Sequence, residues 1–119
     1  MLKLTFCLRR LPQMTRQEFQ RYWLESHGPL VRKHAAALNI RRYVQLHTLE
    51  APLNDAIRAS RGSPEAYDGV AELWFDSRES LAQGAASEAG RLLLEDEKRF
   101  IDLQRSPLFF GDEKNLVGG

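Results

Sequence analysis

Residues 69–75 carry large apolar side chains on both faces of one predicted strand, and this constrains the fold more than any other segment. Because side chains alternate between the two faces of a strand, Leu73 and Phe75 lie on one face. Val70 and Trp74 lie on the other. A single layer of helices covers only one of these faces, so the second face needs another cover. We predict that this cover is a second copy of the chain.

Alternation of apolar and polar residues predicts two further strands, at residues 2–9 and 40–48. The apolar run 108–110, after Pro107, predicts a short final strand. Helices are expected after Thr15, which opens a capping box with Glu18, and after the capping residues Ser77 and Ser87. The long segment 50–66 is rich in Pro, Gly and Asn, and we interpret it as a connection with a turn or two of helix.

The residues that follow the first helix predict a corner in the chain. Gly28 favours a left-handed helix end, and Pro29 favours the first position of a new helix. His27 would then lie at a helix C-terminus, where the helix dipole favours the charged imidazole.

The order strand, helices, strand, strand, helices, strand predicts an α+β fold. It matches the ferredoxin-like βαββαβ sandwich, with helices on one side of a four-stranded antiparallel sheet. With 119 residues there is room for one domain, which we place at residues 1–113. Residues 114–119 are expected to form a flexible tail.

Charge and cysteine content argue against several classes of partner and location. The 17 basic residues nearly cancel the 16 acidic ones, so nucleic acid and membrane are not expected partners. Cys7 is the single cysteine, and the N-terminal segment lacks the apolar core of a signal peptide. We therefore expect a soluble cytoplasmic protein.

Three segments carry a resemblance to a known family, and they are residues 19–30, 42–47 and 67–75. Residues 96–102, with Phe110 and Glu113, add a weaker match. Together they resemble the EthD family. This resemblance implies a dimeric α+β barrel, in which two ferredoxin-like sheets face each other and ligands bind between sheet and helices. The long connection after His47 departs from the family pattern.

The resemblance implies a broad range of activities. The superfamily includes cofactor-free monooxygenases, haem-handling enzymes, lactone isomerases and polyketide cyclases, so the fold leaves the reaction open. EthD proteins are associated with ether-degrading oxidative systems, and fungal relatives with dehydration or decarboxylation of polyketides.

His27 is the first candidate catalytic residue, because an imidazole titrates near neutral pH and suits a general acid or base. The alternative is that His27 only ties the first helix to the next turn by a hydrogen bond.

His47 is the second candidate catalytic residue, and it shares a strand face with Tyr43 and Gln45. If Glu72 and Trp74 lie on the same face of the neighbouring strand, the five side chains would line one substrate cavity. The alternative is that His47 and Glu72 form an inert pair in the dimer interface.

Other candidate residues have plainer explanations. Tyr22 and Trp23 are expected in the core, with a possible contact of Tyr22 to substrate. We interpret Asp96, Glu97 and Asp102 as capping or ion-pairing groups. No metal site is predicted, since three scattered histidines do not complete a ligand set. No cofactor is predicted either, with haem on His27 or His47 as the alternative.

The sequence thus favours an enzyme that acts on a small apolar molecule, aromatic or polyketide-like, by oxidation or by proton transfer without a cofactor. One alternative is an accessory protein that binds a hydrophobic compound and supplies it to a separate oxidase. Another is a dimeric structural module without a ligand, which a fully packed interior would indicate.

Overall fold

Four antiparallel strands form a single sheet in the computed structural model, which describes residues 1–119. They are β1 (Leu2–Leu8), β2 (Arg42–His47), β3 (Gly69–Phe75) and β4 (Leu108–Asp112). The spatial order β2-β3-β1-β4 puts the two most apolar strands in the centre. The predicted ferredoxin-like α+β fold is confirmed.

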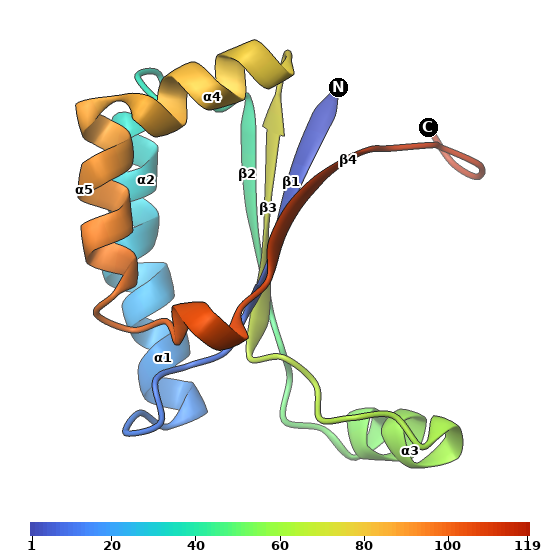
Figure 1. Cartoon of the computed structure of the whole chain (residues 1–119). Helices are drawn as coiled ribbons and strands as arrows, with labels where there is room; N and C mark the ends of the chain where they lie inside the picture. The colour runs from blue at the N-terminus through green and yellow to red at the C-terminus, as the bar shows by residue number, and fades with distance from the viewer.

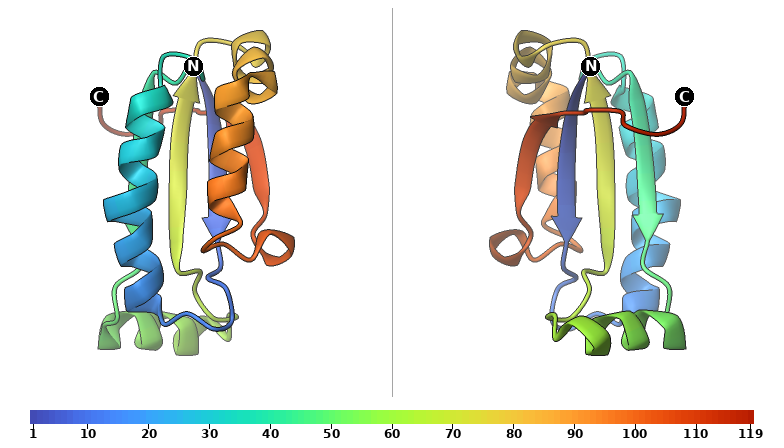
Figure 2. Two further views of the ribbon diagram at one scale, coloured as in Figure 1. Left: turned by 90° about the vertical axis from the view of Figure 1, so that its left-hand side faces the viewer. Right: turned by 90° about the vertical axis from the view of Figure 1, so that its right-hand side faces the viewer.

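One face of the sheet is covered by helices (Figures 1 and 2). These are α1 (Arg16–Tyr22), the π-helix η1 (Trp23–His27), α2 (Gly28–His34), α4 (Arg78–Ala86) and α5 (Glu88–Glu97). Thr15 forms the predicted capping box with Glu18, and Ser77 and Ser87 cap α4 and α5 as expected. A 3-10 turn, η2 (Leu103–Arg105), leads into β4.

The predicted corner at Gly28 and Pro29 is wrong. Gly28 has a right-handed helical backbone, with φ −55° and ψ −50°, and the chain continues from α1 through η1 into α2 without a break. Pro29 lacks an N–H, and its ring would collide with the carbonyl group four residues earlier in a regular α-helix. The wider π turn relieves this collision, because the Gly28 N–H bonds to the carbonyl of Trp23 instead.

The core lies between the sheet and the helices. Its main cluster joins strand residues to aromatic side chains of the helical layer, namely Phe6, Leu8, Phe19, Trp23, Ala71, Phe100 and Ile101. A second cluster, at the other end of the helical layer, comprises Val31, Leu38, Ala89 and Leu93. Leu73 and Phe75 share one face of β3 as predicted, and the structure shows that this face, which also carries Ala71, is the one over the core.

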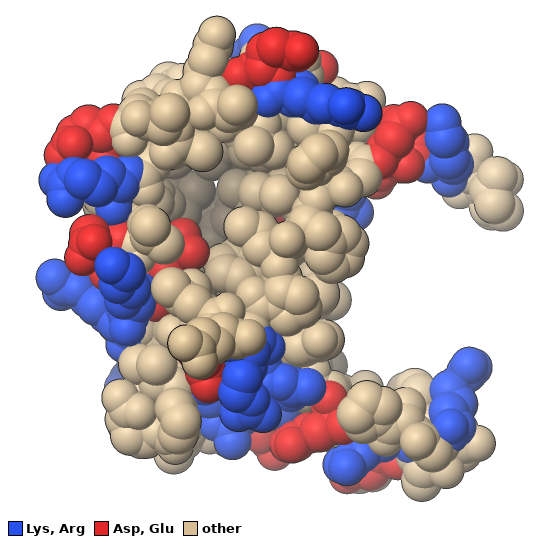
Figure 3. Space-filling model, in the orientation of Figure 1, with Lys and Arg blue, Asp and Glu red and all other residues tan.

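The other face of the sheet is uncovered (Figure 2, right). We call it the open face, and its apolar members are Val44, Leu46, Val70, Trp74 and Phe109. Leu46 and Phe109 each expose 56% of their surface. Tan, uncharged atoms line the hollow over this face in Figure 3. An apolar surface of this kind marks an interaction site.

The long connection between β2 and β3 contains α3 (Pro52–Arg61), a longer helix than the turn or two expected. This helix projects beyond the sheet on the side of the open face, and the C-terminal segment projects on the same side at the opposite end (Figure 1). None of the α3 residues is buried. No helix of the chain has the length and apolar character needed to cross a membrane.

Candidate active site

A cavity of about 110 Å³ lies between the sheet and the helices. Two of its 13 lining residues, His27 and Glu97, are not hydrophobic. The others come from the strands and from the helical layer: Leu4, Phe6, Leu8, Trp23, Val31, Tyr43, Ala71, Leu73, Leu93, Ile101 and Leu108. An apolar cavity with few polar groups is the usual form of a small-molecule site.

The π-helix η1 aims His27 into this cavity. Phe19, Trp23, His27 and Val31 are spaced by four residues, and all four are buried. In an α-helix, residues with this spacing drift around the axis by about 40° at each step. A π turn winds less per residue and cancels part of this drift, so all four side chains face the sheet. π turns of this kind are frequent at functional sites.

Asp96 holds the His27 ring in place. His27 Nδ1 lies 2.7 Å from Asp96 Oδ2, and the Tyr22 hydroxyl donates to Asp96 Oδ1 at 2.6 Å. An ionised carboxylate can only accept hydrogen bonds, so Nδ1 carries the proton that it shares with Asp96. Asp96 thus anchors His27 from α5. Because His27 lies inside a continuous helical segment, the helix C-terminus expected at this position, with its dipole, is absent.

His27 has the properties of a general base. Burial lowers the pKa of His27 below its usual range, against the opposing effect of Asp96, so the neutral imidazole dominates near pH 7. With Nδ1 protonated, Nε2 carries a lone pair, and Asp96 on Nδ1 is the only hydrogen-bond partner of the ring. An oriented imidazole with one free nitrogen can accept a proton from a molecule in the cavity.

Glu97, the other polar residue of the cavity, comes from the last position of α5. Burial, together with the adjacent charge of Asp96, raises the pKa of Glu97 to about 7. A perturbed carboxyl in an apolar cavity is a functional-site indicator.

Tyr43, Gln45 and His47 share one face of β2, as predicted, and they form a hydrogen-bonded row. The Gln45 amide donates to the Tyr43 hydroxyl at 2.8 Å and to the Trp23 carbonyl at 3.0 Å. His47 Nε2 lies 2.7 Å from Gln45 Oε1, and its ring stacks on Trp23 with centroids 4.5 Å apart. Burial lowers the pKa of His47.

His47 does not line the cavity that contains His27. It lines an open groove of about 510 Å³ between β2 and α2, together with Gln45. Tyr43 and Val31 line both the groove and the cavity, and so form the wall between them. The two predicted catalytic histidines are thus close in the fold but face different spaces.

Glu72 and Trp74 lie on the open face, away from both spaces. The register pairs Glu72 with Val44 and Trp74 with Arg42, whereas His47 is opposite Gly69 and Tyr43 is opposite Leu73. The condition for a cavity shared with His47 is therefore not met, and His47 does not pair with Glu72. Glu72 instead forms an ion pair with Lys3. The Trp74 indole donates to Glu113, and Lys3 and Arg42 lie near its ring.

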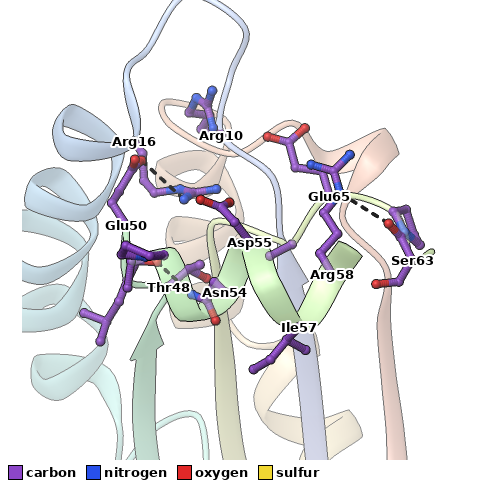
Figure 4. A pocket seen from close by; sticks show the side chains of 15 residues that line it. Arg10, Arg16, Thr48, Glu50, Asn54, Asp55, Ile57, Arg58, Ser63 and Glu65 are labelled. Atoms are coloured by element: carbon purple, nitrogen blue, oxygen red, sulfur yellow. Dashed lines mark hydrogen bonds and ion pairs between the residues drawn. The ribbon is translucent and has the colours of Figure 1, made fainter. Parts of the chain in front are cut away.

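A larger, polar pocket of about 550 Å³ lies between α3 and the start of α1 (Figure 4). Arg10 and Arg16 both bind the buried Asp68, at 2.5 and 2.9 Å, and Arg16 also binds Glu50. Burial opposes the charge of Asp68, but hydrogen bonds from Arg10 and Arg16 hold its pKa below the usual range. These ion pairs attach the long connection to the start of α1. No group of three or more His, Cys, Asp or Glu side chains is placed to hold a metal ion.

Comparison with known families identifies the chain. The family model described as the EthD domain matches residues 11–104, which include His27, Asp96 and Glu97. This chain belongs to the EthD family. No protein with curated annotation matches it significantly.

Solved structures support the fold of this EthD chain. An EthD-family protein of Bacillus halodurans has 23% sequence identity and a TM-score of 0.70, over 96% of this chain and 99% of that one. A dimeric protein of unknown function with a ferredoxin-like fold, from Bacteroides fragilis, has 9% identity and a TM-score of 0.66, over 94% and 95%. A structure described as an antibiotic biosynthesis monooxygenase has 16% identity and a TM-score of 0.60, over 97% and 100%.

Sequence reasoning missed the two carboxylates of this EthD site. Lys98 and Arg99 follow Asp96 and Glu97 directly, and this favours their interpretation as capping or ion-pairing groups. One signal was available: the buried Leu93 and Phe100 lie on either side of them at helical spacing, which places residues 96 and 97 on the inner side of the turn. Tyr22, predicted to touch substrate, contacts Asp96 and is absent from the cavity lining.

Proposed function

We propose that this EthD chain is a small-molecule enzyme that transfers protons without a bound cofactor, with His27 as its general base. One observation carries the proposal: the His27 ring is held by Asp96 through Nδ1, while Nε2 is unpartnered in an apolar cavity. A carboxylate in this position selects the tautomer of the imidazole and stabilises the imidazolium ion that forms when the base accepts a proton.

The cavity favours a small apolar substrate. Its volume of about 110 Å³ suits a single ring, and apolar side chains provide 11 of its 13 lining residues. A larger aromatic or polyketide-like compound would extend into the groove beside Tyr43, which adjoins the cavity. A carbonyl group in such a compound makes the neighbouring C–H acidic enough for an imidazole to remove the proton.

An oxidative reaction is the broader form of the same proposal. The resemblance to an antibiotic biosynthesis monooxygenase favours it. In a cofactor-free oxygenation, the base would first deprotonate the substrate, and the resulting anion would then react with dioxygen. His27 has the same role in both reactions.

The direct test is exchange of substrate protons for deuterium. Cyclohexanone is a suitable probe, because it is one ring in size and its α-protons exchange slowly at neutral pH. Wild-type protein in D₂O is expected to accelerate this exchange, as followed by proton NMR. The variant His27→Gln should lose at least about 100-fold of the rate, the usual contribution of a general base. His34→Gln, a partly exposed histidine of α2, is the matched control and should keep the full rate.

A binding role is the second candidate, favoured by the apolar lining of the cavity. An accessory protein that supplies a hydrophobic compound to a separate oxidase would need the cavity but not the base. Cyclohexanone would then raise the melting temperature of both wild type and His27→Gln, since a ligand that binds only the native state stabilises it. No exchange would occur in either protein.

We also propose that the chain forms a homodimer through the open face. Apolar side chains on this face, such as Leu46 and Phe109, remain largely exposed in the single chain. The similar protein of Bacteroides fragilis is described as dimeric, which supports this assembly. A face that pairs with its own copy would cover these side chains on both partners at once.

A further inference from the structure

Glu97 and His27 enter the same cavity from two neighbouring helical elements, α5 and η1. The two residues are held in different ways. His27 is anchored by Asp96, whereas no side chain or backbone N–H forms a hydrogen bond with the Glu97 carboxyl, and its pKa is affected only by burial and by Asp96. A carboxyl group without a structural partner in an apolar cavity has no evident role in stability.

The surroundings of Glu97 favour its neutral, protonated form. The residues that β1, β3 and β4 contribute to the cavity are all apolar. The other titratable groups that line it are His27, which is neutral near pH 7, and Tyr43. The adjacent Asp96 adds negative charge, and so does the carbonyl end of α5, where Glu97 is the last residue.

The basic residues that follow Glu97 do not compensate its charge. Lys98 binds Glu95, and Arg99 lies 3.9 Å from Asp96, with both basic side chains more than half exposed. A carboxylic acid kept neutral in this way is a hydrogen-bond and proton donor near neutral pH.

We propose that Glu97 is the general acid that works with His27 and that the pair acts on neutral carbonyl compounds. This deepens the proposed function and rests on it. His27 Nε2 accepts the proton from the carbon next to the carbonyl as that C–H bond breaks and a C=C bond forms. The Glu97 O–H donates its proton to the carbonyl oxygen, which gives the enol, an imidazolium and the Glu97 carboxylate. Return of both protons, with the carbon protonated at the same or a conjugated position, regenerates the enzyme without any oxidant.

The test compares Glu97→Gln with Glu95→Gln in the cyclohexanone exchange assay. Both variants remove one carboxylate from α5, but Glu95 is exposed and pairs with Lys98. We expect Glu97→Gln to lose about 100-fold of the exchange rate and Glu95→Gln to stay within about twofold of wild type. Wild type should show a rate that falls above about pH 7, and Glu97→Gln should lack this fall. Thermal melting checks that both variants are folded.

Carbon-13 NMR titration of the Glu97 side-chain carboxyl tests the inference without any substrate. A midpoint near pH 7 is expected, and a midpoint below about 5, the ordinary range of glutamate, would overturn the inference.

The outcomes separate this inference from the proposed function. If His27→Gln abolishes exchange and Glu97→Gln does not, His27 remains the base and Glu97 is not the acid. If only Glu97→Gln abolishes exchange, the role of His27 is wrong. If wild type itself does not accelerate exchange, both proposals are overturned.

Discussion

The two faces of the sheet are built from alternate residues of the same strands, yet the environment of polar groups differs between them. On the covered face, His27 and Glu97 are surrounded by apolar side chains. Burial lowers the pKa of His27 and raises that of Glu97, and both shifts favour the neutral form. On the open face, Lys3 forms an ion pair with Glu72, the Trp74 indole donates to Glu113, and Arg42 lies over the Trp74 ring.

This difference shows that the hydration and proton affinity of a polar side chain depend on whether its face of the sheet is covered by helices. A charge on the open face can be paired and partly hydrated, so it contributes little beyond specificity. A titratable group on the covered face is partly desolvated, and the resulting change in its proton affinity suits it to the proposed proton transfer. The groups proposed to react are accordingly on the helix-covered side, and the open face is the one proposed for the dimer.

The largest effect is expected from a charge on the open face. Leu46→Asp places a carboxylate in the proposed dimer interface, where it would be desolvated without a partner. Because each interface residue occurs twice in a twofold dimer, we expect a loss of about 4 kcal/mol, or about 1000-fold in the dissociation constant. Sedimentation equilibrium at micromolar concentration measures this loss directly.

The control for this experiment is Leu94→Asp on α5, a similarly exposed leucine on the helical side, with 46% of its surface accessible. It should leave the dimer intact. A wild-type protein that sediments as a monomer, or a dimer that survives Leu46→Asp, would remove the assigned role of the open face.

A smaller effect is expected on the free energy of unfolding when a change of pH titrates Glu97 on the covered face. The folded-state pKa of Glu97 is raised to about 7 from an ordinary value near 4.5, so the native state holds this proton more tightly than the unfolded chain. The stabilisation from Glu97 protonation is therefore full below about pH 4.5 and is lost as pH rises to 7, a change of about 3 kcal/mol. Urea denaturation from pH 5 to 8 measures it.

Glu97→Gln provides the comparison, since it cannot ionise. Its free energy of unfolding should exceed that of wild type at pH 8 and approach it at pH 5. Burial lowers the pKa of His27, which destabilises both proteins equally as pH falls below 6.5, so the difference between them isolates Glu97. Parallel curves for the two proteins would mean that Glu97 ionises freely.

The smallest effect is expected from loss of the hydrogen bond that Tyr22 donates to Asp96, the partner of His27. Tyr22→Phe removes the hydroxyl that donates to Asp96 and leaves the ring packed near Phe100. We expect a loss of about 1.5 kcal/mol in the free energy of unfolding, typical of a hydrogen bond to a charged group. Tyr67→Phe, whose hydroxyl makes no hydrogen bond to the protein, should be neutral within about 0.5 kcal/mol. Equal effects of the two substitutions would show that Tyr22 does not support Asp96.

Local signals along the chain predicted most of the fold. The Thr15–Glu18 capping box, the serine caps and the alternation in β3 each depend on residues a few positions apart. Such interactions need no knowledge of the rest of the molecule, so they can be recognised in the sequence alone. The exception is Gly28 and Pro29, where local rules favoured a corner and the packing of four buried side chains against the sheet maintains a continuous helix.

The candidate site was only partly predictable. His27 was identified, and so were Tyr43 and Gln45 as neighbours on one strand face. The partners of His27 come from residues about 70 positions later, and no spacing rule connects η1 to α5. The placement of Glu72 and Trp74 depended on strand register, since a shift of one residue moves every side chain to the other face.

By itself, the sequence determined the order of elements, the two-sided apolar character of β3 and the need for a cover on each face, because these follow from side-chain periodicity. Only the tertiary structure decided which polar groups share the cavity and how they titrate. Proton affinity in a protein depends on desolvation and on charges brought close by folding, and both are set by contacts between distant parts of the chain.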